Sequence, residues 1–177
     1  MKLVILDRDG TINHDSDQYI KSPAEWKPIP GSMEAIARLT QRGWRCVVAT
    51  NQSGIARGLF DMATLNAIHT EMHRAVAQAG GRIEAIFFCP HAADSNCECR
   101  KPKPGLLREI ASRFDVELKS VPMIGDSLRD VEAAAAAGAQ PYLVLTGKGR
   151  QTRDAVGLPR GTEVVADLAA IAARLAP

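Results

Sequence analysis

The sequence predicts a doubly wound α/β fold, in which helices cover both faces of a parallel sheet. Short apolar runs alternate with helix-like segments along the chain. The runs are continuously apolar rather than alternating, as in strands that are buried on both faces. The resulting βαβα order implies right-handed crossovers. With 177 residues, 46% hydrophobic and 24% charged, we expect one Rossmann-like domain over 1–177.

The elements follow one another in a regular order. The expected strands are 2–6, 45–49, 83–88, 121–124, 141–145 and a weaker run at 163–166. The expected helices are 32–42, 61–79, 104–114, 129–137 and 167–175. Asp61 is a typical helix-starting residue, whereas Gly43 and Gly138 are typical helix stops. Two long irregular stretches, 12–30 and 89–103, are left over, and such loops are commonly functional in compact domains.

Composition excludes several classes of function. The net charge is only +2 and aromatic residues make up 5%, which argues against a nucleic-acid-binding surface. The apolar start, residues 1–6, is too short for a signal peptide, and no run approaches the ~20 apolar residues of a membrane span. We expect a cytoplasmic monomer that acts on a small molecule.

The first expected strand ends in two carboxylates, Asp7 and Asp9. One of them can attack phosphorus while the other moves a proton, which divides a hydrolysis into two easier steps. A plain turn and a calcium-binding loop are the alternatives. A calcium loop closes with a Glu twelve positions along, where this chain has Gln18 followed by Tyr19. The pair therefore favours phosphoryl chemistry.

A third carboxylate, Asp126, follows the expected strand 121–124. Together with Asp7 it forms an oxygen-rich site of the kind that Mg²⁺ prefers. Asp130 lies four residues further on and either caps the next helix or orients the site.

Other strand ends carry groups suited to holding a phosphate. Hydroxyl and amide side chains follow the second strand as Thr50, Asn51, Gln52 and Ser53. Lys101 and Lys103 both precede a proline, and we choose Lys101 as the residue that neutralises a transferring phosphoryl group.

Three cysteines and a histidine fall together just before Lys101. They are Cys89, His91, Cys97 and Cys99. Three thiolates and an imidazole match a four-coordinate structural Zn²⁺ site. A disulfide leaves one cysteine over and is rare in the cytosol. A zinc-bound loop would set the position of the residues that follow it, Arg100 and Lys101.

In this order, the motifs resemble those of the haloacid dehalogenase superfamily of phosphatases. The resemblance rests on DRDGT at 7–11, Thr50, Lys101 and GDSLRD at 125–130. It implies a nucleophilic Asp7, and an Asp9 that protonates the leaving oxygen and later activates water. It also implies that Thr50 and Lys101 hold the phosphoryl group, and that Asp7, Asp126 and the carbonyl of Asp9 bind Mg²⁺. No large insertion separates the motifs, so we expect no cap domain.

The zinc motif and TNQSGIARG at 50–58 narrow the resemblance to the D-glycero-D-manno-heptose 1,7-bisphosphate phosphatases, and to the related histidinol-phosphate phosphatases. The heptose enzymes are short single-domain proteins, as we expect this chain to be. They imply loss of the C7 phosphate through an aspartyl-phosphate, in the ADP-heptose route to the lipopolysaccharide core. The alternative is a place in histidine biosynthesis. The expected substrate contacts are Asp15, Ser16, Asp17, Gln18, Asn51, Gln52, Ser53, Arg100, Ser127 and Arg129.

Three further features have simpler interpretations. Thr70 follows His69, so His69 and His73 do not form the zinc-protease pattern, and we expect an exposed or core-edge pair. The stretch TGKGR at 146–150 has Gly after its lysine where a P-loop has Ser or Thr, so we expect no nucleotide site there. Trp26 is expected to be a packing residue.

Overall fold

The computed structural model describes residues 1–155 and 157–177, and in these residues six parallel strands form one sheet in the order β3-β2-β1-β4-β5-β6. The strands are β1 (Lys2–Leu6), β2 (Trp44–Asn51), β3 (Ile83–Cys89), β4 (Pro122–Gly125), β5 (Gln140–Val144) and β6 (Glu163–Val165). All six predicted strands are present, with ends shifted by no more than two residues. The predicted fold class is confirmed.

Five of the helices are those that the sequence predicts. They are α1 (Ser32–Gln41), α2 (Met62–Gln78), α3 (Gly105–Phe114), α4 (Leu128–Ala137) and α6 (Leu168–Leu175). Short 3₁₀ turns also form at η1 (Pro23–Glu25) and η2 (Leu118–Ser120). The sequence did not predict α5 (Gly149–Asp154), which buries only Gly149 and Thr152 and therefore has no apolar period to detect.

Local signals set several helix ends. The side chain of Asp61 accepts a 2.8 Å hydrogen bond from the backbone N–H of Thr64, which satisfies a free donor in the first turn of α2. Gly138 ends α4 in the left-handed conformation with φ 77°, which glycine adopts without a steric penalty.

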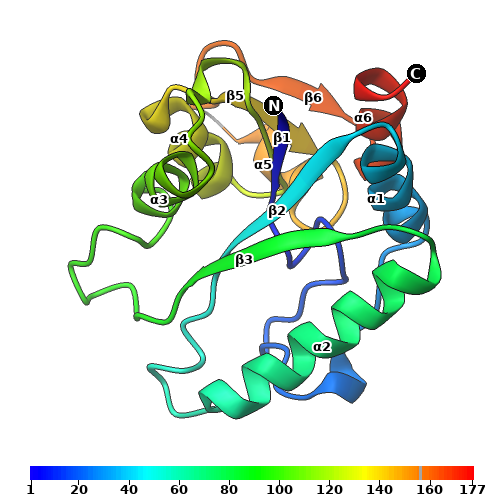
Figure 1. Cartoon of the computed structure of the whole chain (residues 1–177). Coiled ribbons are helices and arrows are strands. Elements are labelled where there is room, and N and C mark those ends of the chain that lie inside the picture. Colours follow the sequence, from blue (N-terminus) through cyan, green and yellow to red (C-terminus); the bar gives the residue numbers. More distant parts are fainter. Residues whose placement is uncertain (156) are drawn as a thin grey trace.

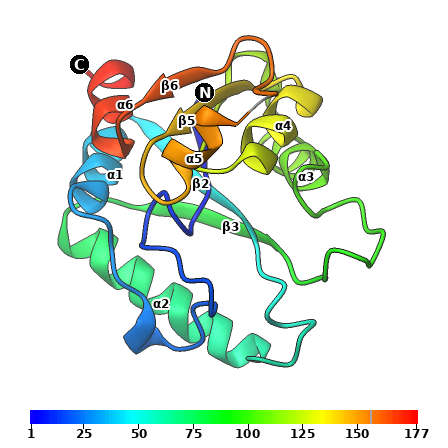
Figure 2. The same ribbon diagram turned by 180° about the vertical axis from the view of Figure 1, so that it is seen from behind.

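The helices cover both faces of the sheet. One face packs against α1, α2 and α6, and the other packs against α3 and α4 (Figures 1 and 2). Along β1, Val4 and Leu6 belong to the first core, whereas Leu3 and Ile5 belong to the second. This two-sided burial explains why the strands are continuously apolar in sequence. Trp26, 3% exposed, packs in the first core.

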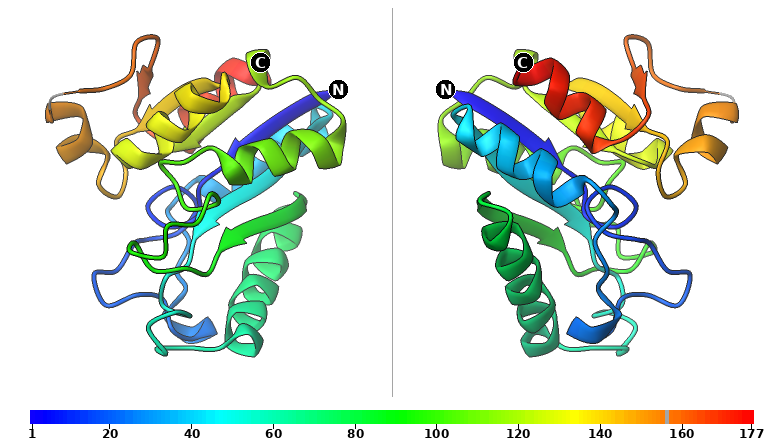
Figure 3. Two further views of the ribbon diagram at one scale, coloured as in Figure 1. Left: turned by 90° about the vertical axis from the view of Figure 1, so that its left-hand side faces the viewer. Right: turned by 90° about the vertical axis from the view of Figure 1, so that its right-hand side faces the viewer.

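The functional residues gather at one edge of the sheet. The arrowheads of β1, β2 and β3 point to the edge where their long following loops lie, and both termini lie at the opposite edge (Figure 3). Strand order reverses between β1 and β4, and such a switch point opens a crevice for ligands. None of the helices in residues 1–155 and 157–177 has the length and apolarity needed to cross a bilayer.

Candidate active site and metal centres

Three buried carboxylates meet at the switch point between β1 and β4. Asp7 follows β1, and Asp126 and Asp130 follow β4. One oxygen from each lies within 4.8 Å of the others. Burial first, and then the negative charges of the neighbouring carboxylates, raise the pKa of Asp7 to about 7 and that of Asp126 to about 8. The cluster is therefore short of positive charge.

Lys101 brings an ammonium group into this cluster. Its Nζ donates hydrogen bonds to Oδ1 of Asp7 at 2.8 Å, to Oδ1 of Asp130 at 2.7 Å and to the carbonyl of Ala49 at 2.7 Å. The ammonium has three N–H donors, and each has a partner. This pairing is needed because the side chain is only 1% exposed. Lys103 lies on the surface instead and pairs with Glu98 at 3.0 Å.

Asp130 both caps a helix and orients the site. Its Oδ2 accepts hydrogen bonds from the backbone N–H and the hydroxyl of Ser127 at 3.0 and 2.7 Å, which closes the start of α4. Its Oδ1 accepts the bond from Lys101. The two interpretations open from sequence are therefore both correct. Ser127, which we expected to contact substrate, directs its hydroxyl at Asp130.

Asp9 is surrounded by hydrogen-bond donors. Arg8 forms a charged pair with it, with Nη2 of Arg8 2.9 Å from Oδ1 of Asp9. Asn13 and Gln52 donate to the two carboxylate oxygens at 2.9 and 3.1 Å. Burial opposes ionisation, but the Arg8 charge and these bonds outweigh it and lower the pKa of Asp9 below its usual value. Asp9 is thus held as a carboxylate that faces the cleft.

The carboxylate cluster fits Mg²⁺. Its donors are hard oxygens, and the ammonium of Lys101 pairs with two of the three carboxylates, Asp7 and Asp130. Two glycines allow the surrounding loops to close on Asp126, because a Cβ on Gly10 or on Gly147 would collide with the Oδ2 atom of that residue. The backbone N–H of Lys148 donates to the same oxygen at 2.8 Å. The loop 146–148, which we set aside as a false P-loop, thus supports Asp126.

The residues after β2 connect the site to Lys101. Asn51 accepts a hydrogen bond from the backbone N–H of Lys101 and donates one to its carbonyl, both at 3.1 Å. Gln52 donates to Oγ1 of the buried Thr50 at 3.0 Å as well as to Asp9. The polar loop TNQSG therefore positions the lysine and both catalytic candidates, Thr50 and Asp9.

A polar cleft of about 200 Å³ opens above these groups. Eight of the ten expected substrate-contacting residues line it, namely Asp15, Ser16, Asp17, Asn51, Gln52, Ser53, Arg100 and Arg129. The lining does not include Gln18, which is exposed, or the buried Ser127. Residues that the sequence analysis missed also line it, namely Tyr19, Ile20, Arg57 and Lys148. Arg57 lies within the motif TNQSGIARG, but the motif alone does not indicate that this side chain lines the cleft.

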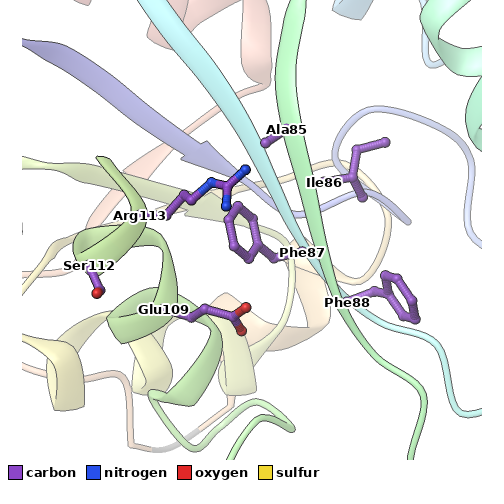
Figure 4. Close-up of a pocket in the computed structure, with 7 residues that line it drawn as sticks. All are labelled: Ala85, Ile86, Phe87, Phe88, Glu109, Ser112 and Arg113. Carbon is purple, nitrogen blue, oxygen red and sulfur yellow. The ribbon is translucent and has the colours of Figure 1, made fainter. Parts of the chain in front are cut away.

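A larger cleft, about 500 Å³, lies away from the carboxylates between β3 and α3. Phe87 points toward Glu109 and Arg113 of α3, while Ile86 and Phe88 point to the opposite face of β3 (Figure 4). The residues that line this larger cleft include no cluster of catalytic side chains. We therefore identify the polar cleft as the candidate site by the chemistry of its side chains and not by its volume.

A second metal-binding arrangement lies in the loop after β3. Nδ1 of His91 is 3.5 Å from Sγ of Cys89 and 3.3 Å from Sγ of Cys99, and the Sγ atoms of Cys89 and Cys97 are 3.7 Å apart. Zn–S bonds of about 2.3 Å in a tetrahedron place sulfur atoms roughly 3.8 Å apart. The four cysteines of the chain are unpaired, so no disulfide competes with this arrangement. The donor set fits Zn²⁺.

Known proteins resemble this chain over almost its whole length. A family model described as HAD-hydrolase-like matches residues 98–171. A curated relative from Bordetella bronchiseptica, D-glycero-beta-D-manno-heptose-1,7-bisphosphate 7-phosphatase, is 63% identical over 99% of this chain and 98% of its own. The chain belongs to this phosphatase family. A Pseudomonas putida protein of the same name is 56% identical over 99% of both chains.

Solved structures of the phosphatase family agree with the fold. The crystal structure of the B. bronchiseptica D,D-heptose 1,7-bisphosphate phosphatase, complexed with magnesium and phosphate, matches with a TM-score of 0.98 and covers 99% of this chain and 98% of its own. The enzyme from Burkholderia thailandensis matches with a TM-score of 0.80 at 54% identity, over 99% of this chain and 98% of its own. Membership of the haloacid dehalogenase-like hydrolases, expected from the motifs, is confirmed.

Proposed function

We propose that this protein removes the C7 phosphate of D-glycero-D-manno-heptose 1,7-bisphosphate and leaves heptose 1-phosphate. The names of relatives that are 56–63% identical over almost the whole chain support this substrate. The observation that carries the reaction type is the buried bridge from Lys101 to Asp7 and Asp130 at the switch point. We further propose that the chain acts in the cytoplasm as a single domain and a monomer, in ADP-heptose synthesis for the lipopolysaccharide core.

In the first step, a carboxylate oxygen of Asp7 attacks the phosphorus atom of the C7 phosphate. The bond from phosphorus to the sugar oxygen breaks, and Asp9 in its protonated form gives its proton to that oxygen. Thr50 and Lys101 hold the phosphoryl oxygens, and the ammonium of Lys101 offsets their growing negative charge. The product of this step is an aspartyl-phosphate on Asp7.

In the second step, Asp9 acts as a base. It takes a proton from a water molecule as the water oxygen attacks phosphorus. The bond between phosphorus and the Asp7 oxygen breaks, which releases phosphate and restores the nucleophile. The four donors around Asp9 keep its carboxylate pointed into the cleft for both proton transfers.

Mg²⁺ would be held by Asp7, Asp126 and the backbone carbonyl of Asp9. When bound, it supplies positive charge to the phosphoryl oxygens. The crystal structure of the B. bronchiseptica enzyme, complexed with magnesium and phosphate, supports magnesium as the metal. Bound magnesium also favours the ionised form of Asp7, which the nucleophile requires.

Zn²⁺ would be held by Cys89, His91, Cys97 and Cys99 and would have a structural role. Four protein donors leave no open position for a substrate. Arg100 and Lys101 follow the last ligand directly, so a folded zinc loop fixes where Lys101 enters the site.

The sugar and its second phosphate would occupy the polar cleft. Asp15, Ser16 and Asp17 offer oxygens to sugar hydroxyls from the loop after β1. Arg100 and Arg129 line the same cleft and would bind the second phosphate.

The test compares phosphate release from heptose 1,7-bisphosphate and from histidinol phosphate, with magnesium present and at matched concentrations. We expect kcat/KM to be higher for the bisphosphate by about a hundredfold or more, with only the C7 phosphate lost. A preference for histidinol phosphate would move the enzyme to histidine biosynthesis. If neither compound releases phosphate, both candidate substrates are wrong and the substrate of the proposed mechanism is unknown.

A further inference from the structure

The residue between the two catalytic aspartates, Arg8, is fully buried beneath the site. Its side chain is 0% exposed, and a buried guanidinium requires partners for its donors. Nε donates to Oδ1 of Asp9 at 3.0 Å, and Nη2 donates to Oδ2 of Asp9 at 3.2 Å. This two-pronged contact fixes the plane of the carboxylate from behind. The other terminal nitrogen, Nη1, points away from Asp9.

His69 of α2 supplies the partner for that nitrogen. Nε2 of His69 lies 3.1 Å from Nη1 of Arg8, although the two residues are 61 positions apart in sequence. His69 is only 7% exposed, whereas His73, one turn further along α2, is exposed. The sequence predicted an exposed or core-edge position for both histidines, whereas in the structure His69 is buried and His73 is exposed.

The histidine is neutral in this arrangement. Burial first, and then the charge of Arg8, lower the pKa of His69 to about 3. A guanidinium only donates, so the unprotonated nitrogen of His69 facing it must be Nε2, and Nδ1 carries the ring hydrogen. His69 therefore accepts a hydrogen bond and holds the guanidinium in one orientation.

We propose that His69 is a positioning residue for the reaction, acting through Arg8 on the orientation of Asp9. The proposal rests on the proposed function, in which Asp9 protonates the leaving oxygen. Asn13 and Gln52 each donate one hydrogen bond to Asp9, and Arg8, which His69 contacts, donates two more. Loss of the acceptor on His69 frees the guanidinium to turn, and the carboxylate paired with it turns too.

The leaving group distinguishes this role from simple packing. A sugar alkoxide leaves only if it receives a proton, whereas 4-nitrophenolate leaves without one. A fault in the orientation of Asp9 therefore slows the first step for a sugar phosphate and spares 4-nitrophenyl phosphate. The ratio kcat/KM reports this first step in both cases.

The experiment measures kcat/KM on both substrates for the wild type, His69→Leu and His69→Gln, with Ile68→Ala as a control on the same buried helix face. We expect His69→Leu to lose about tenfold or more on heptose 1,7-bisphosphate and roughly threefold or less on 4-nitrophenyl phosphate. His69→Gln, whose amide oxygen can accept, should recover most of the loss. Ile68→Ala should lower Tm but leave the ratio between the two substrates unchanged.

Equal losses on both substrates, or a Gln variant as impaired as the Leu variant, would show that His69 only packs. If the wild type does not hydrolyse the heptose bisphosphate, the proposed substrate is wrong. The same ratio is then measured on a hexose phosphate that the enzyme does hydrolyse, so the two failures remain distinct.

Discussion

The ammonium of Lys101 donates a 2.8 Å hydrogen bond to Oδ1 of Asp7, although the two residues are separated by 94 positions in the chain. The same ammonium binds Asp130 at 2.7 Å. One buried cation is thus shared by the nucleophile and by the helix cap of α4. This sharing links the activity of the site to its stability, and several predictions depend on it.

The first prediction concerns the nucleophile. Asp7→Asn keeps the size of the side chain but removes its charge and its nucleophilic oxygen. We expect turnover to fall by about a thousandfold or more with a folded protein, as judged by circular dichroism and by Tm. The control is Asp115→Asn, because Asp115 is exposed and adopts a left-handed conformation that Asn tolerates. Activity above a few per cent in Asp7→Asn would rule out the assigned nucleophile.

The second prediction separates the two lysines of the RKPKP segment. Lys101→Met leaves Asp7 and Asp130 buried without their cation, which typically costs about 3–5 kcal/mol in the free energy of unfolding. We expect this variant to lose both stability in urea titration and nearly all activity. Lys103→Met should change neither, because Lys103 is at the surface and its pair with Glu98 is exposed. Similar behaviour of the two variants would contradict the buried bridge.

The third prediction tests the zinc loop. Cys97→Ser removes one of four ligands, so elemental analysis should find much less zinc than the one atom per chain expected for the wild type. Lys101 follows this loop, so we also expect lower kcat. Cys46→Ala is the matched control, because Cys46 is buried in the core on β2 and should leave the metal content unchanged. Unchanged zinc in Cys97→Ser would refute the ligand set.

The fourth prediction concerns the pH dependence of stability. Burial first, and then the charge of Arg8, lower the pKa of His69 to about 3, with Asp9 opposing and His73 adding a little. Between pH 6.5 and 3 the unfolded chain therefore takes up a proton at this histidine and the folded chain does not. The free energy of unfolding contributed by His69 is fully present above pH 6.5 and decreases as pH falls.

Urea titrations of the wild type and His69→Gln at pH 7.5 and pH 5 measure this effect. The wild type should lose roughly 2 kcal/mol more than the variant between the two values, since one pKa unit corresponds to about 1.4 kcal/mol. Parallel losses would mean that His69 is protonated in the folded protein at pH 5 and does not accept from Arg8.

The sequence predicted most of the fold because its strands are buried on both faces and therefore continuously apolar. It also predicted much of the site, because Asp7 and Asp126 directly follow parallel strands and Thr50 lies in the last two residues of another, and such strand ends meet at one edge of the sheet. Spacing along the chain could not reveal which lysine turns inward, since Lys101 and Lys103 both precede proline. The fold decides this, through the two hydrogen bonds between the side chain of Asn51 and the backbone N–H and carbonyl of Lys101.

The residues that the sequence did not reveal depend on contacts between distant elements. His69 meets Arg8 only because the fold brings α2 and the end of β1 to the same core, and neither residue has a local pattern that indicates the pair. Lys148 lies in a stretch that we compared only with a nucleotide-binding motif. In the structure its Nζ atom lies 3.4 Å from Oδ2 of Asp15, and both residues line the polar cleft. Gln18 shows the opposite error, since its neighbours line the cleft and it does not.

The fifth prediction concerns Gly147, which has φ +54° and lies against Asp126. Gly147→Ala would place a methyl group on Oδ2 of the carboxylate that we assign to Mg²⁺. Gly161 is the control, because it has φ +85° but nothing within 4 Å of the position of a Cβ. Both substitutions strain a left-handed backbone, which should lower the free energy of unfolding by about 1 kcal/mol in each variant. Gly147→Ala should lose more, because its added Cβ would also lie against Cα of Gly10.

Only Gly147→Ala should also displace Asp126. We therefore expect the magnesium concentration for half-maximal activity to rise by about tenfold or more in Gly147→Ala, and to stay within about twofold in Gly161→Ala. Isothermal titration of magnesium into each metal-free protein measures the same difference without turnover. Equal magnesium affinities in the two variants would mean that Asp126 is not a ligand or that the loop moves aside freely. Weaker affinity in Gly147→Ala alone would link the loop 146–148 to the metal site, since strain is common to both variants and the collision is not.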